Sequence, residues 1–162
     1  MRETDPLIAR RKLLAFGLGL GAFGASAGFL GLPGRAAASL FGKGTVTAES
    51  GSGAYRFNVR IAGTEQARIQ GLQGVRYLGA RDGMWFDFGR SRKVSMWMKN
   101  TFISLDMVFV RDDGTVAGVI RGTTPKSLKQ LTIDEPVRYV LEVTAGVTRA
   151  IGLKPGDRVT LD

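Results

Sequence analysis

The clearest β-strand signal in the sequence is the stretch LDMVFVRDDG, residues 105–114. Its first six residues are almost all apolar, and this length and composition suit a buried strand. The triplet Asp112-Asp113-Gly114 follows, and Asp-Gly tolerates the positive φ angles of a tight hairpin turn. We therefore expect the residues from 115 to 121 to pair back on this strand.

Further strands are predicted on both sides of this hairpin. Residues 55–61 (YRFNVRI) alternate between apolar and polar side chains, which is typical of a half-buried strand. Short apolar runs predict four more strands, at residues 84–88, 94–98, 137–143 and 158–161. The first two of these are expected to form a hairpin around the turn Gly89-Arg90-Ser91.

Two short helices complete the predicted elements. Thr64 can cap a helix that ends near Gly71, and Thr144 can cap one at residues 146–152. Seven short strands and two short helices in about 110 residues indicate a mainly β fold. The architecture predicted is a small β-sandwich or partly open barrel.

The composition excludes several kinds of catalytic and metal site. The chain has 162 residues and contains neither Cys nor His. Zinc sites of the thiolate or imidazole type, Cys-His or Ser-His nucleophiles and His- or Cys-ligated haem therefore lack their side chains. We expect no metal site and no cofactor.

The first 38 residues have the composition of an export signal. Arg10 and Arg11 precede a weakly apolar, Gly-rich run, and Ala36-Ala37-Ala38 fits a cleavage site after Ala38. The leader resembles a twin-arginine signal, which implies a periplasmic or secreted protein. The alternative is an uncleaved leader that anchors the protein in a membrane.

The remaining chain is expected to form one domain behind a linker. Residues 39–53 are rich in Gly, Ser, Thr and Ala and predict a flexible tether, so the domain is expected at 54–162. From residue 39 onward, 18 Lys and Arg stand against 12 Asp and Glu, a net charge of +6. This excess favours anionic partners as a long-range bias.

The segment WMKNTFISLDM, residues 97–107, carries the densest set of polar and aromatic groups. Such a cluster can hydrogen-bond a small polar ligand, and it can equally satisfy the backbone groups of its own loop. The candidate binding residues are those of this segment together with one Arg and one Glu from other elements: Trp97, Lys99, Asn100, Thr101, Asp106, Arg68 and Glu142.

At this segment the sequence resembles a known family, DUF192 (ACR, COG1430). The resemblance rests on the run from Met96 to Asp106, the helix of Glu65, Ala67, Arg68, Gly71 and Leu72, the strand of Gly83, Met84, Phe86 and Phe88, and the stretches 136–142 and 152–159. It runs from about Tyr55 to Asp162, which is nearly the whole chain after the leader. It implies a mostly β, sandwich-like domain, and it implies no activity because the family has none assigned.

These residues support two hypotheses about function. The first is a non-catalytic module that binds an anionic small molecule or a cell-envelope component, with no nucleic-acid partner. The alternative is a hydrolase or transferase, which would use Ser95 or Thr101 with Lys99, or the carboxylates of Asp106 and Glu142. We favour the first, because a Ser-Lys or Thr-Lys pair needs a desolvated lysine and nothing in the sequence requires one.

Overall fold

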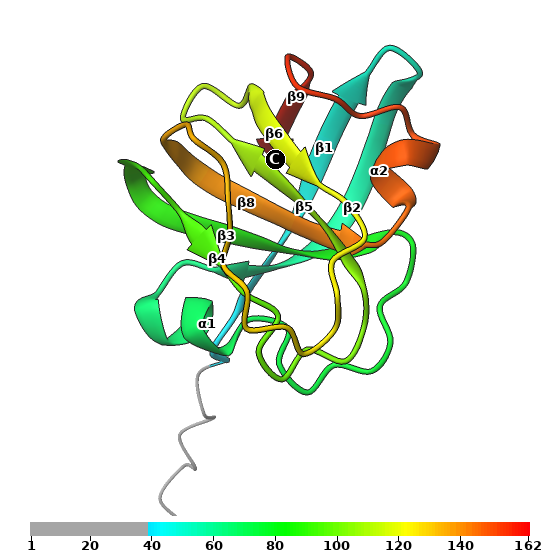
Figure 1. Ribbon diagram of the computed structural model, residues 1–162. Helices are drawn as coiled ribbons and strands as arrows, with labels where there is room; N and C mark the ends of the chain where they lie inside the picture. The colour runs from blue at the N-terminus through cyan, green and yellow to red at the C-terminus, as the bar shows by residue number, and fades with distance from the viewer. Residues whose placement is uncertain (1–38) are drawn as a thin grey trace, which may run out of the picture. The chain divides into compact units, whose positions relative to one another are not determined.

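The computed structural model describes residues 39–162, which form nine strands and two short helices (Figure 1). The strands are β1 (Gly42–Ser50), β2 (Gly53–Ala62), β3 (Asp82–Arg92), β4 (Ser95–Met96), β5 (Leu105–Val110), β6 (Val116–Ile120), β7 (Leu131–Thr132), β8 (Val137–Thr144) and β9 (Arg158–Leu161). The helices are α1 (Glu65–Gln70) and α2 (Val147–Ala150). The mainly β fold predicted from the sequence is confirmed, whereas the leader and its cleavage site lie outside the described residues.

Seven strands form one curled sheet in the order β6-β5-β8-β3-β2-β1-β9, and β4 pairs with β7 separately. All neighbours in the large sheet are antiparallel except β2 and β3, which run parallel and are connected through α1. The two edge strands approach each other at a bridge between Thr115 and Arg158. The sheet is therefore a partly open barrel rather than a flat layer (Figure 1).

One core, which we call the inner cluster, fills the concave side of the sheet. Its buried members come from every strand of the large sheet and from the segment after α2: Val46, Ala48, Phe57, Val59, Trp85, Val108, Val110, Val116, Leu141, Val143, Leu153 and Val159. Val147 and Ile151, on and next to α2, pack against this cluster. The short helix α2 thus helps to cover the barrel interior.

A second core, the outer cluster, covers the opposite face of the sheet. Its buried members are Ala62, Ala67, Leu72, Met84, Phe86, Val94, Met98, Leu105, Met107, Phe109, Val137 and Val140. They bring α1, the β3–β4 turn and the loop after β4 onto the central strands β3, β5 and β8. Because both faces are covered, all six residues of β5 are buried.

The prediction of a flexible tether at residues 39–53 is wrong for most of its length. Residues 42–50 form β1, which pairs with β2 along all nine residues and with β9 from Val46 to Glu49. Val46 and Ala48 are fully buried in the inner cluster. The small residues of this segment suit a strand because Gly42 and Gly44 lie close under the side chain of Ile61. The domain therefore begins before residue 54.

The predicted hairpin between residues 84–88 and 94–98 does not form. β3 continues to Arg92, and its neighbours in the sheet are β2 and β8. The returning segment is reduced to β4, which pairs with β7 from the long loop before β8. Backbone pairing between segments distant in sequence thus replaces the local hairpin, and both edges of β3 pair with other strands, β2 and β8.

The other predicted elements are confirmed with small changes. The strand 105–110 and its Asp-Gly turn are present, and Gly114 adopts the expected positive φ of 86°. The hydroxyl of Thr64 accepts a hydrogen bond from the Ala67 amide and caps α1. Thr144 does not cap α2, because its hydroxyl donates to the Leu78 carbonyl. No helix in residues 39–162 has the length and apolar character needed to cross a membrane.

Candidate functional site

An open cavity of about 370 Å³ lies between α1, the end of β3, β4 and the loop that follows β4. This volume falls in the range of small-molecule sites, roughly 300–1,000 Å³. Polar, charged, aromatic and aliphatic side chains line it together: Glu65, Arg68, Ile69, Gln70, Leu72, Gln73, Phe86, Phe88, Arg92, Ser95, Met96, Trp97, Lys99, Thr101 and Glu142. The backbone of Gly71 completes the lining.

Glu142 provides the deepest ionisable group of the cavity. It is 4% exposed and lies on β8, opposite Met84 of β3 and Met107 of β5, both fully buried. Within the described residues its carboxyl group has no hydrogen-bond partner, and burial raises the pKa of Glu142 to about 8. The group is therefore mostly neutral at pH 7, as expected for an unpaired carboxyl group with little access to water.

The rim of the cavity is formed by residues on either side of a buried anchor, Met98. Met98 is fully buried in the outer cluster, and its amide donates to the Ser127 carbonyl. The neighbours on both sides turn outward: Trp97 is 49% exposed and Lys99 is exposed. The Lys99 ammonium lies 5.5 Å from the Trp97 ring centroid, a distance that allows a cation–π contact.

Asn100 and Thr101 turn the chain back into the domain. Asn100 has a φ of 54°, a left-handed conformation that Asn adopts more readily than most residues. Its side-chain amide donates to the Gln73 side chain, and its carbonyl accepts from the Gly74 amide. Thr101 is buried and its amide closes the turn on the Met98 carbonyl. Asn100 therefore joins this loop to the loop after α1, and its side chain is not part of the cavity wall.

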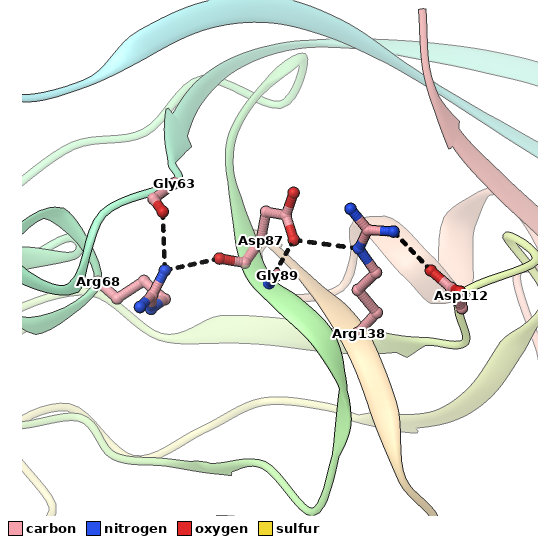
Figure 2. A network of polar contacts seen from close by, with 6 residues as sticks. All are labelled: Gly63, Arg68, Asp87, Gly89, Asp112 and Arg138. Atoms are coloured by element: carbon pink, nitrogen blue, oxygen red, sulfur yellow. Dashed lines mark hydrogen bonds and ion pairs between the residues drawn. The ribbon is translucent and has the colours of Figure 1, made fainter.

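Arg68 fixes α1 to the sheet at the edge of the cavity (Figure 2). One guanidinium nitrogen donates to the carbonyls of Gly63 and Asp87, at 2.9 and 2.8 Å. The guanidinium carbon also lies 5.5 Å from the Phe88 ring centroid. Part of the hydrogen-bonding capacity of Arg68 is thus used to hold the wall in place.

The polar network continues across the sheet from Asp87 (Figure 2). The Asp87 carboxylate accepts from the Gly89 amide at 2.7 Å and from Arg138 at 3.3 Å, and Arg138 also donates to Asp112 at 2.8 Å. These two carboxylates raise the pKa of the Arg138 guanidinium above its ordinary value. The network links α1 through β3 and β8 to the β5–β6 turn.

Asp106 lies on the other face of the sheet and ties α2 to the β6 end. It is fully buried, and one carboxylate oxygen accepts from the Gly122 amide at 2.9 Å. The other oxygen accepts from the amides of Gly146 and Thr148 and from the Thr148 hydroxyl. Asp106 therefore supplies the cap that Thr144 was expected to give to α2.

The structure brings five of the seven candidate residues to the cavity: Arg68, Trp97, Lys99, Thr101 and Glu142. It does not bring Asn100 or Asp106 there, and it accounts for both by hydrogen bonds within the domain. Sequence reasoning missed Phe88 and Arg92 as wall residues, because the predicted hairpin put them beside its turn at residues 89–91 and not next to α1. Ser95 was considered only as a nucleophile, and it lines the cavity from β4.

The register of β5 and β8 separates the two carboxylates considered as an acid–base pair. Asp106 is opposite Val143, whereas Glu142 is opposite Met107. Side chains alternate between the two faces of a sheet, so these carboxylates point to opposite faces. Among residues 39–162, no three acidic, His or Cys side chains are grouped as metal ligands would be.

Fold and site together define a small, mainly β domain with a cavity on the outer face of a curled sheet. Residues 46–161 match the family described as uncharacterized ACR, COG1430 (DUF192). The chain therefore belongs to this family. No curated protein matches the chain.

Two solved structures resemble this domain closely. One, from Sinorhizobium meliloti 1021 and provisionally described as a transcription regulator, is 39% identical, with a TM-score of 0.73 over 76% of this chain and 96% of that one. The other, a protein of unknown function from Novosphingobium aromaticivorans DSM 12444, is 32% identical, with a TM-score of 0.71 over 73% of this chain and 84% of that one. Both support the fold and leave the activity open.

The role of Asp106 predicts a large loss of stability on its replacement. Asp106→Ala removes the acceptor of four hydrogen bonds and leaves three backbone amides without it. We expect the free energy of unfolding to fall by about 3 kcal/mol in chemical denaturation. Asp134→Ala is the control, because this exposed carboxylate pairs only with Lys93 and should change stability by under about 0.5 kcal/mol. Equal effects of the two substitutions would contradict the structural role.

The buried carboxyl group of Glu142 predicts that stability depends on pH. Burial raises its pKa from 4.5 to about 8, so between these values the unfolded chain releases a proton that the folded domain retains. The free energy of unfolding should therefore fall as pH rises from about 4.5 to 8 and then level off. Glu142→Gln removes this ionisation and should be more stable than wild type at pH 8, by an amount on the order of a few kcal/mol. Parallel stability curves for the two proteins across this range would contradict the shift.

Proposed function

We propose that the domain is a non-catalytic binding module that takes a small molecule into the cavity beside Trp97. The observation that carries the proposal is an open cavity with an unpartnered, buried carboxyl group on its floor. A fully structural loop would have its polar groups paired within the domain, as Asn100 and Asp106 do. A polar group left unpaired in a cavity is what a binding site offers to a ligand.

The walls suit an anionic molecule with an apolar part. Arg92 and Lys99 are exposed cations at the cavity, and the aromatic rings of Phe88 and Trp97 lie beside them. Cations attract carboxylate or phosphate groups, while the rings provide flat apolar contact. An anionic small molecule or an anionic part of a cell-envelope component has this combination of properties.

An enzymatic role has less support from the geometry. Ser95, Thr101 and Lys99 all line the cavity, so the residues of a hydroxyl–lysine pair are near one another. Lys99 is nevertheless exposed and contacts the Trp97 ring, whereas a lysine that acts as a base must be desolvated to lose its proton near neutral pH. The Thr101 hydroxyl donates to the Lys99 carbonyl, at 3.4 Å.

A role in nucleic-acid binding is suggested only by the description of the Sinorhizobium protein and by the positive charge. The two helices have six and four residues, which is short for a helix that reads the major groove. We therefore favour a small ligand over nucleic acid.

We also propose that the protein is exported by the twin-arginine route and acts in the periplasm or outside the cell. The proposal rests on Arg10 and Arg11, the weakly apolar run and the Ala36-Ala37-Ala38 site. Cleavage after Ala38 would leave β1 intact, because this strand begins at Gly42. An uncleaved leader acting as a membrane anchor is the competing outcome.

The binding proposal predicts that ligands raise Tm only when the cavity is empty enough to hold them. We expect a thermal-shift screen of metabolites and cell-envelope fragments to yield compounds that raise Tm by a few degrees. Ser95→Trp should abolish these shifts, because it fills the cavity from an exposed position on β4. Ser91→Trp, at an exposed position of β3 that is outside the cavity lining, should preserve them.

Lys99→Ala gives a second measurement that does not depend on tolerance of a large side chain. It should keep the unliganded Tm and weaken the shift given by anionic ligands. A screen without ligands, or ligands that act equally on Ser95→Trp, would reject the cavity as the binding site.

The export proposal predicts a defined mature protein. Terminal-residue analysis of protein from the periplasm should give Ser39 as the first residue. Replacing Arg10 and Arg11 together by Lys should retain the full-length chain in the cytoplasm. Retention of residues 13–32 in membrane-bound protein would support the anchor instead.

A further inference from the structure

The surroundings of Glu142 restrict the chemistry of the ligand, provided that the cavity is the binding site proposed above. The side chain leaves β8 between two fully buried methionines, Met84 and Met107, and lies under the residues of α1. No amide, hydroxyl or cation of residues 39–162 hydrogen-bonds its carboxyl group. With no partner in the described part of the chain, the group is available to an incoming molecule or water.

The charged groups that face the cavity come from every element around it. α1 contributes Glu65 and Arg68, β3 contributes Arg92, and the loop after β4 contributes Lys99. The cavity is thus lined by three cations and one carboxylate in addition to Glu142. Of the cations, Arg68 already donates to two backbone carbonyls. None of them forms an ion pair with Glu142, and burial is the sole cause of its raised pKa. The entrance favours anions, while the floor carries a neutral acid.

We propose that the cavity binds small organic acids, and that the neutral carboxyl group of Glu142 donates a hydrogen bond to an anionic oxygen of the ligand. In this arrangement Glu142 keeps its proton, and one negative charge is shared between two acidic groups. Hydrogen bonds to a charged acceptor are about twice as strong as those between neutral groups. The cations at the entrance stabilise the same charge from the other side.

This arrangement makes binding depend on pH in a defined direction. An ionised Glu142 would have no proton to donate and would repel the ligand. Since its pKa in the free protein is about 8, affinity should be constant at lower pH and fall above that value. A ligand that carried an ammonium group would behave oppositely, because it would pair with the ionised carboxylate and bind more tightly as pH rises.

Three compounds with one shape and different charge separate these cases: 3-phenylpropanoate, 3-phenylpropanamide and 3-phenylpropylamine. Binding is measured by calorimetry from pH 6 to 9 on wild type and on Glu142→Gln, which keeps an N–H donor and cannot ionise. We expect the carboxylate to bind most tightly to wild type, with an affinity that falls about tenfold between pH 6 and 9. On Glu142→Gln its affinity should not change with pH, and the amide should bind weakly to both proteins at every pH.

Several outcomes would overturn the inference. Tightest binding of the amine, an affinity for the carboxylate that does not fall above pH 8, or the same fall in Glu142→Gln would each do so. Failure of all three compounds to bind would also overturn it. The cavity itself would still stand as a binding site if the screen gave a ligand sensitive to Ser95→Trp, and it would be rejected together with the inference if no such ligand existed.

Discussion

The two-sided burial of β8 is the constraint from which the site arises. β8 lies between β3 and β5 in the middle of the curled sheet, with the inner cluster on one face and the outer cluster on the other. Residues 140–143 of this strand are buried on both faces, so a carboxyl group there is desolvated whichever face it points to. Glu142 points to the outer face, where it lines the cavity next to α1.

In the polar segment of residues 97–107, some side chains hold the fold together and others are exposed. Met98 anchors the loop, Asn100 makes its turn and Asp106 caps a helix on the far face of the sheet. Trp97 and Lys99 are exposed and line the cavity. Most residues of the segment therefore hold the wall of the cavity in position, and only a few of its side chains can contact a ligand.

The elements predicted correctly from the sequence are those that depend on a few neighbouring residues. The Asp-Gly turn after β5 and the Thr64 cap of α1 need only neighbouring residues, and both were predicted. The β4–β7 pair joins segments far apart along the chain, so the nearer turn suggested a hairpin instead. β1 pairs with its neighbour β2, but its many Gly, Ser, Thr and Ala residues suggested a tether. The cavity was predictable in part. Trp97 and Lys99 were identified from their residue types, whereas the placement of Asp106 and Glu142 on opposite faces depends on strand register.

The pairing of β1 with β9 has a consequence for biosynthesis. The first strand of the domain lies between β2 and the last strand, and residues 46–49 pair with residues 158–161. The barrel interior can therefore be completed only after residues 158–161 have left the ribosome. The slow step of folding is expected to be the long-range closure that brings residues 158–161 onto β1.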